Sequence, residues 1–127
     1  MWRVGYPDQY RFLDDEHDEM GAILTEMGQP SGDPGLEALR RGIVRFLTAF
    51  KAHRRSEESV MRESRFDEYE LHKTHHEHVI GAIETILAYF DRQSLPRHKD
   101  EIVRHLSNKL SEESFFDEPL AAFLSGR

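Results

Sequence analysis

Histidines and acidic residues recur at helical spacing in this sequence. His53 is followed four residues later by Glu57, and His72 is followed four residues later by His76, so each pair projects from successive turns of one helix face. Imidazole nitrogens and carboxylate oxygens act as general bases and as metal ligands. The chain has eight histidines and no cysteine, which excludes disulfides, thiolate metal ligands and cysteine nucleophiles. Any metal site or general base must therefore be built from histidine and carboxylate.

The elements that carry these pairs are amphipathic helices, because apolar residues continue on both sides of each pair at spacings of three and four. Glycine and proline separate four such segments, at about residues 12–27, 36–63 and 68–92 and from residue 97 onward, with a short apolar tail at 120–124 beyond Pro119. Asp14 or Asp15 is positioned to cap the first segment. Residues 1–11 lack the helical pattern, which indicates a non-helical arm packed on the helices.

Four amphipathic helices joined by short connections bury their apolar faces most economically in an antiparallel, up-down-up-down four-helix bundle. With 127 residues the chain has the length of one domain, since domains usually contain roughly 100 to 200 residues. We therefore predict an all-α fold in a single domain over residues 1–127. It consists of the bundle, the N-terminal arm and the short helical tail.

Polar residues interrupt the apolar faces of the first three helices at one level of the bundle. They are His17, His53, Glu57, His72 and His76. Burying one such group without a partner costs about 2 to 7 kcal/mol, so the set requires compensation, which a metal centre supplies. Four imidazoles exceed what one ion usually takes, and the two oxygens of Glu57 can each take one cation, which predicts two ions. Structural zinc closes with four ligands, whereas histidine and carboxylate in a bundle core suit iron or manganese.

These residues resemble the bacterial hemerythrins, which are small oxygen-binding di-iron bundles. The resemblance rests on His17 within Leu-Asp-Asp-Glu-His-Asp-Glu-Met, on His53-x-x-x-Glu57 and on His72-x-x-x-His76, and it covers nearly the whole chain. It implies that His72 and His76 hold one iron and that His17 and His53 hold the other. Glu57 would bridge the two irons, which would also share an oxo or hydroxo bridge.

The fourth helix departs from the family pattern, which has a histidine there followed five residues later by a bridging aspartate. The residue five positions after His105 is Leu110, which cannot coordinate a metal. In the family, the fourth-helix histidine follows the second histidine of the third helix by a fixed separation. The same separation from His76 leads to Glu112 in place of the histidine and, five residues later, to Asp117 in place of the aspartate. We therefore predict Glu112 and Asp117 as ligands, with His105 as the rival of Glu112. An anionic ligand in place of imidazole favours the ferric state.

The remaining polar residues near these positions have less specific expectations. His75, His78 and His98 lie off the apolar faces and are expected in solvent. Glu58 points away from Glu57 and is expected on the surface or as an outer partner of the metal site. Asp14, if it does not cap the first helix, is placed to orient the imidazole of His17.

The charge balance argues against nucleic-acid binding. Asp and Glu number 24 against 17 Lys and Arg, giving a net charge of −7, whereas nucleic-acid binding needs a basic face. No apolar run approaches the roughly 20 residues that cross a bilayer, and residues 1–8 lack the basic and apolar segments of a signal peptide. We therefore expect a cytoplasmic protein without membrane or nucleic-acid partners.

The resemblance implies a non-heme di-iron protein that binds molecular oxygen reversibly, as a carrier, store or delivery protein. The carboxylate predicted on the fourth helix keeps a second class open, a di-iron redox enzyme that consumes oxygen or peroxide. An oxygen-sensing or iron-sensing module is a third class. The partners expected are oxygen or peroxide and an unidentified electron donor, and the protein is expected to be an oxygen binder rather than an enzyme.

Overall fold

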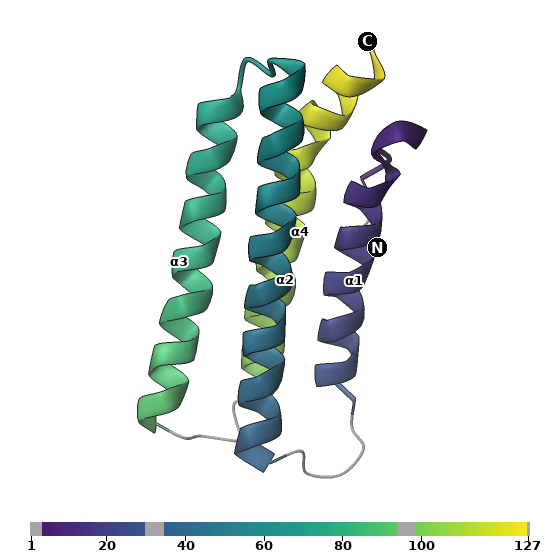
Figure 1. Ribbon diagram of the computed structural model, residues 1–127. Coiled ribbons are helices and arrows are strands. Elements are labelled where there is room, and N and C mark those ends of the chain that lie inside the picture. Colours follow the sequence, from purple (N-terminus) through teal and green to yellow (C-terminus); the bar gives the residue numbers. More distant parts are fainter. Residues whose placement is uncertain (1–3, 30–34, 94–98, 127) are drawn as a thin grey trace.

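The computed structural model describes residues 4–29, 35–93 and 99–126. A single 3-10 turn, η1 (Asp8–Tyr10), leads into α1 (Arg11–Met27), and α2 (Gly35–Ser64), α3 (Tyr69–Gln93) and α4 (Lys99–Ser125) follow. These described residues contain four α-helices and no strand, which confirms the predicted all-α four-helix fold. Successive helices run in opposite directions, as the colours in Figure 1 show.

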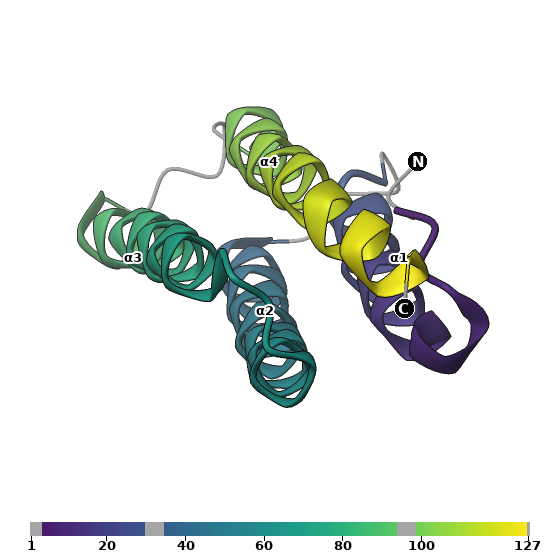
Figure 2. The same ribbon diagram turned by 90° about the horizontal axis from the view of Figure 1, so that it is seen from above.

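The four helices surround a common interior, which is seen end-on in Figure 2. Helix α2 contacts α1, α3 and α4, and α4 contacts α1 and α3 as well. This arrangement brings side chains from all four helices to the same level. None of the described helices is both long and apolar enough to cross a membrane.

Two apolar clusters fill the interior above and below a polar level. The larger one includes Met20, Ile43, Phe46, Phe50, Val79, Ile83, Leu106 and Leu110, and the smaller one includes Tyr6, Leu13, Val60, Met61, Phe66, Leu120 and Leu124. Along α2, Phe50 belongs to the larger cluster and Val60 to the smaller one. His53 and Glu57 lie between them on the same helix face, so the apolar clusters seal the polar level from both ends.

The connection from α2 to α3 is short and sets the register between these two helices. Arg65 adopts a left-handed conformation with φ 59°, and the amide of Phe66 donates to the carbonyl of Met61 at 3.0 Å. This is the Schellman arrangement, in which the residue after the helix usually is glycine. The buried Phe66 ring anchors the turn, which fixes the position of His72 relative to Glu57.

Two boundaries differ from the prediction. Helix α1 begins at Arg11, so Asp14 lies inside the helix and neither it nor Asp15 is the N-cap. Residues 4–7 are non-helical, but residues 8–10, assigned above to the arm, form the 3-10 turn η1. Residues 30–34 and 94–98 lie outside the described residues. They include His98, most of the break predicted between residues 27 and 36, and the break predicted between residues 92 and 97.

The separate tail predicted after Pro119 was wrong, because α4 continues through this proline to Ser125. Proline lacks the amide hydrogen and crowds the preceding turn, so it bends or breaks a helix. Here Leu120 and Leu124 are buried in the smaller apolar cluster, and this packing holds the last turns in helical form. Figure 1 shows that these turns, in yellow, lean away from the line of the rest of α4.

Candidate metal centre

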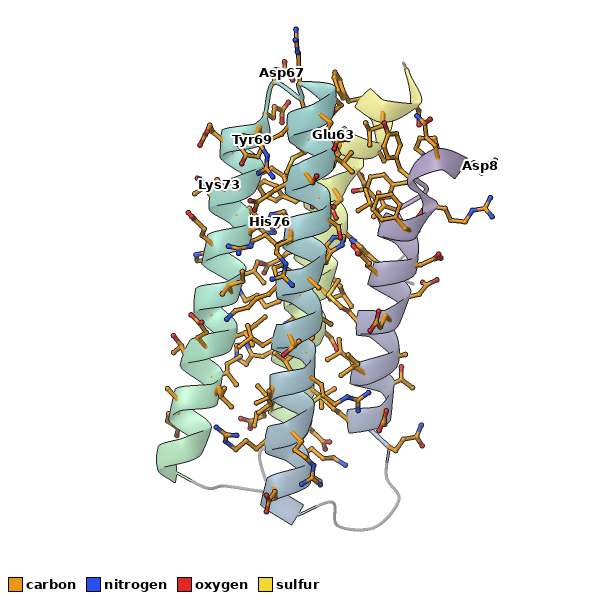
Figure 3. All side chains as sticks on the ribbon, in the orientation of Figure 1. Asp8, Glu63, Asp67, Tyr69, Lys73 and His76 are labelled. Carbon is orange, nitrogen blue, oxygen red and sulfur yellow. The ribbon has the colours of Figure 1, made fainter. Side chains whose placement is uncertain are left out.

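All four helices contribute buried histidines and carboxylates to one polar cluster. Its members are His17 from α1, His53 and Glu57 from α2, His72 and His76 from α3, and Glu113 and Asp117 from α4. Each of these residues is at most 2% exposed. Figure 3 labels His76 at this level of the bundle. We call this set the seven-residue cluster.

The seven-residue cluster divides into two overlapping groups, each able to hold a metal ion. His17 and His53 form one group with the three carboxylates, and His72 and His76 form the other with the same three carboxylates. Within each group the candidate ligand atoms lie within 4.8 Å of one another. Two imidazoles on each side of shared carboxylates is the arrangement expected of a site for two neighbouring ions.

Glu57 presents one oxygen to each histidine pair. Its Oε1 lies 2.9 Å from His72 Nε2 and 2.8 Å from His76 Nε2, whereas its Oε2 lies 3.1 Å from His53 Nε2. This carboxylate can therefore bridge two ions, as the sequence predicted for Glu57.

Asp117 is placed in the same way from the opposite side. Its Oδ1 lies 2.7 Å from His72 Nε2, and its Oδ2 lies 2.8 Å from His17 Nε2. The two carboxylates thus face both histidine pairs from α2 and from α4, and either can bridge.

The fourth-helix carboxylate is Glu113 and not Glu112. Glu112 is exposed, and its Oε1 lies 3.5 Å from Lys109 Nζ. Glu113 is fully buried, and its Oε2 lies 3.0 Å from His76 Nε2 and 3.2 Å from His53 Nε2. The prediction of Glu112 assumed the five-residue spacing of the family. Two side chains five residues apart do not lie on the same face of a straight helix. The four-residue spacing from Glu113 to Asp117 keeps both side chains on one face.

The apolar stripe of α4 contains the signal that identifies Glu113. Four leucines of this helix are buried: Leu106, Leu110, Leu120 and Leu124. Adding residues 113 and 117 gives one continuous buried stripe with alternating spacings of four and three. His105, the rival predicted for the same role, is exposed and lies outside the cluster. Glu113 also approaches both histidine pairs, so its charge acts on both halves of the site.

Outer partners fix three of the imidazoles with Nε2 inward. The Nδ1 atom of His53 lies 2.7 Å from Glu16 Oε1, and that of His76 lies 3.0 Å from Glu58 Oε2. His17 Nδ1 lies 3.1 Å from Ser114 Oγ. A hydrogen bond donated from Nδ1 leaves the Nε2 lone pair free for a metal and makes it more basic. This is the outer arrangement of metal-binding histidines.

Sequence reasoning found Glu58 as a possible outer partner but missed Glu16 and Ser114. Both lie on a different helix from the histidine that they contact, and spacing along one helix carries no information about such pairs. Ser56 Oγ also donates to Glu16 Oε2 at 2.7 Å. The second oxygen of Glu16 is therefore held as well.

The ionisation of the metal-free cluster follows from its burial and its mixture of charges. Burial lowers the pKa of His76, but Glu113 and Glu57 outweigh it and raise that pKa to about 10. Burial likewise lowers the pKa of His53, yet Glu57, Asp117 and other acceptors hold it well above its usual range. Protonated imidazoles therefore take the place of cations when no metal is present.

The three carboxylates do not titrate alike. Burial raises the pKa of Glu57, but His53 and the hydrogen bonds around it bring that pKa well below its usual range. Burial and the charge of Glu57 raise the pKa of Glu113, which His76 and neighbouring imidazoles nevertheless hold well below the usual value. Burial together with the charges of Glu113 and Glu57 raises the pKa of Asp117 well above its usual value. The metal-free cluster thus pairs carboxylate anions with protonated imidazoles and retains protons that a metal would have to displace.

The N-terminal arm closes the site beside Glu57. Tyr6 is buried, and its hydroxyl donates to Glu57 Oε2 at 2.7 Å. Burial and the nearby carboxylates, Glu57 first among them, raise the pKa of Tyr6 well above its usual value, which keeps this proton in place. Asp14 holds the arm, because its carboxylate accepts from the amides of Val4 at 2.6 Å, Gly5 at 3.2 Å and Tyr6 at 2.8 Å. The predicted helix cap is therefore not the role of Asp14, because its carboxylate binds the amides of the arm.

His75 is buried, contrary to the expectation that it lies in solvent. Its ring stacks on Phe116 with centroids 3.9 Å apart and planes inclined by 2°, and this aromatic contact across α3 and α4 removes it from water. His78 on the same helix is exposed, as expected. The sequence contained no sign of the stacking, because Phe116 is on another helix.

The fold and the site together define a four-helix bundle with a buried histidine and carboxylate centre able to hold metal. The chain is 28% identical over 106 residues to myohemerythrin of Sipunculus nudus, a similarity that covers 84% of this chain and 83% of that protein. No family model matches the chain, and no solved structure matches it significantly. The chain is thus similar to a myohemerythrin over most of its length, and its four helices and its buried cluster agree with that similarity.

Proposed function

We propose that this chain is a non-heme di-iron protein that binds molecular oxygen reversibly. One observation carries the proposal. Two pairs of imidazoles lie on opposite sides of a set of carboxylates, and both pairs share these carboxylates. The donor set fits iron, because imidazole and carboxylate together suit iron or manganese better than the tetrahedral ligand sets of structural zinc. Homology to myohemerythrin supports iron over manganese.

Each residue of the site has a defined task in this proposal. His17 and His53 would hold one iron and His72 and His76 the other, with Glu57 and Asp117 shared between them. Bound iron would supply the reversible change between ferrous and ferric states on which oxygen uptake depends. The protein's own contribution is to fix the ligands through Nδ1 partners and to keep water away with the two apolar clusters.

Tyr6 supports reversibility by holding a proton near the centre. Its hydroxyl donates to Glu57 Oε2, and its raised pKa keeps it protonated. The tyrosine therefore stabilises Glu57 as an anion without giving up its proton, and the buried ring excludes solvent from this side. Excluding water from this side of the centre would limit irreversible oxidation of bound iron.

A second function is favoured by one specific observation, the third buried carboxylate. Glu113 stands where the resemblance implies a neutral histidine, and its Oε2 approaches both histidine pairs. An anionic donor stabilises ferric iron. The alternative is therefore a redox enzyme that consumes oxygen or peroxide at the expense of an electron donor.

Metal analysis combined with gas exchange tests both functions. The proposal requires two irons per chain and a reduced protein that takes up oxygen and releases it under vacuum. Retention of manganese or of a single ion would refute the di-iron centre. Rapid, irreversible oxidation would refute the carrier function, and many turnovers with peroxide and a reductant would establish the enzyme. The Glu112→Gln variant, altered at an exposed neighbouring carboxylate, should behave like the wild type and serves as the control.

A further inference from the structure

A second layer of contacts surrounds Glu113, outside the seven-residue cluster. His75 lies on the same helix as His72 and His76, is 9% exposed, and has its ring flat against Phe116. Phe116 also meets the edge of the His72 ring, with centroids 5.8 Å apart and planes inclined by 89°. One phenyl ring thus holds both imidazoles in orientation.

Glu113 differs from the other two carboxylates of the cluster. Glu57 and Asp117 each turn both oxygens toward the histidine pairs. Glu113 turns only Oε2 inward. Its Oε1 is buried and has no hydrogen-bond partner among the described residues.

Among the described residues, His75 places a ring nitrogen beside this oxygen. His75 Nε2 lies 3.3 Å from Glu113 Oε1, and it too is buried without a hydrogen-bond partner among the described residues. Buried polar atoms are rarely left unpaired, because each loses its water without compensation. A donor and an acceptor that face each other at this distance can satisfy one another after a small rotation.

We propose that His75 is a positioning residue for Glu113. It donates its Nε2 hydrogen to Oε1, so that Glu113 offers a metal only Oε2. The stacking on Phe116 fixes the plane of the imidazole and hence the direction of the donated hydrogen bond. This inference rests on the proposed function, since it assigns to His75 control over how Glu113 meets the iron. It concerns residues for which the family resemblance assigned no role.

Substitution at position 75 tests the assignment through metal retention. The His75→Phe variant keeps a flat ring against Phe116 but loses the donor, whereas His75→Gln restores a donor. We expect both variants to load iron and His75→Phe to release one iron to a chelator 10-fold to 100-fold faster than the wild type. His75→Gln should release it at a rate close to the wild type. His78→Phe, at an exposed histidine of the same helix, is the matched control and should leave the release rate unchanged.

Mössbauer spectra of the loaded protein provide a readout independent of activity. His75→Phe should change the quadrupole splitting of the iron sites because Glu113 is free to turn, and His75→Gln should restore the wild-type spectrum. Unchanged spectra and release rates in His75→Phe would overturn the inference while leaving the proposed function standing. Loss of one iron in both variants would identify His75 as a ligand and overturn its positioning role. A wild type that binds no iron would overturn the proposed function and this inference with it.

A second variant covers the case in which His75→Phe does not fold. Phe116→Leu removes the stacked ring while His75 and Glu113 remain. We expect faster iron release than in the wild type, because the imidazole is no longer held in plane. Helical circular dichroism establishes that this variant folds, and an unchanged release rate in the folded variant would overturn the inference.

Discussion

Metal binding by this protein should release protons and become tighter as the pH rises. Glu113 and Glu57 overcome the effect of burial and raise the pKa of His76 to about 10 in the metal-free protein. At pH 7 this imidazole is therefore protonated, and a metal that binds its Nε2 must displace the proton. A pKa about 3 units above the pH corresponds to about 4 kcal/mol, or about a thousandfold in apparent affinity.

The apparent affinity should accordingly rise about tenfold for each pH unit between pH 7 and 9, from His76 alone. The raised pKa of His53 makes the dependence steeper. The sign is fixed because groups with raised pKa values hold protons that compete with the metal below those values.

Anaerobic titration with ferrous iron against a chelator of known pH dependence measures this slope. A pH indicator in weakly buffered solution measures the protons released, and we expect at least one per chain. His76→Gln should release fewer protons, whereas His78→Gln, changed at an exposed position of the same helix, should match the wild type. A flat affinity without proton release would refute the reasoning, because it would show neutral imidazoles in the metal-free cluster.

Three further substitutions test separate parts of the structure. Glu113→His should slow oxidation of the reduced protein in air by removing the third anion from the centre, and equal rates in Glu113→His and Glu112→His would contradict the assignment of Glu113. Asp14→Ala should lower the free energy of unfolding by about 2 to 4 kcal/mol, because three backbone amides lose their carboxylate acceptor. Urea denaturation measures this loss, with the exposed Glu19→Ala as a control expected within about 0.5 kcal/mol of the wild type. A loss below about 1 kcal/mol in Asp14→Ala would disprove the anchoring role. Arg65→Gly should raise the free energy of unfolding by about 0.5 to 1 kcal/mol, because glycine tolerates the left-handed conformation, and a lower melting temperature would contradict this.

Helical spacing was sufficient to predict the fold and the histidines of the cluster. Each of the pairs His53/Glu57 and His72/His76 lies on one face of its helix. Apolar residues occupy the same face on both sides of each pair. The physics is local here, since one helix determines which of its side chains lie together. The same reasoning located His17, although no second ligand on its helix supports it.

Spacing within one helix could not predict contacts between helices. Glu16 and Ser114 contact their histidines across the bundle, and Asp14 binds the amides of the preceding arm. His75 was wrongly expected in solvent because its stacking partner Phe116 belongs to α4. The error at Glu112 had another cause. The prediction relied on the ligand spacing of the family instead of the apolar stripe of α4, which indicates Glu113.

The balance of charge around the centre bears on the choice between the two functions proposed above. Three buried carboxylates accompany the four imidazoles, and Glu16 and Glu58 add negative charge behind two of those imidazoles. Oxidation of iron adds positive charge, so this environment favours the ferric state.

Two hydrogen-bond donors oppose that tendency. Tyr6 already donates to Glu57, and in our inference His75 donates to Glu113. Each such hydrogen bond draws part of the negative charge of a carboxylate toward the hydrogen-bond donor. On the proposed function, reversible oxygen binding beside a third carboxylate would depend on Tyr6 and His75, and the Tyr6→Phe and His75→Phe variants should both shift the centre toward permanent oxidation.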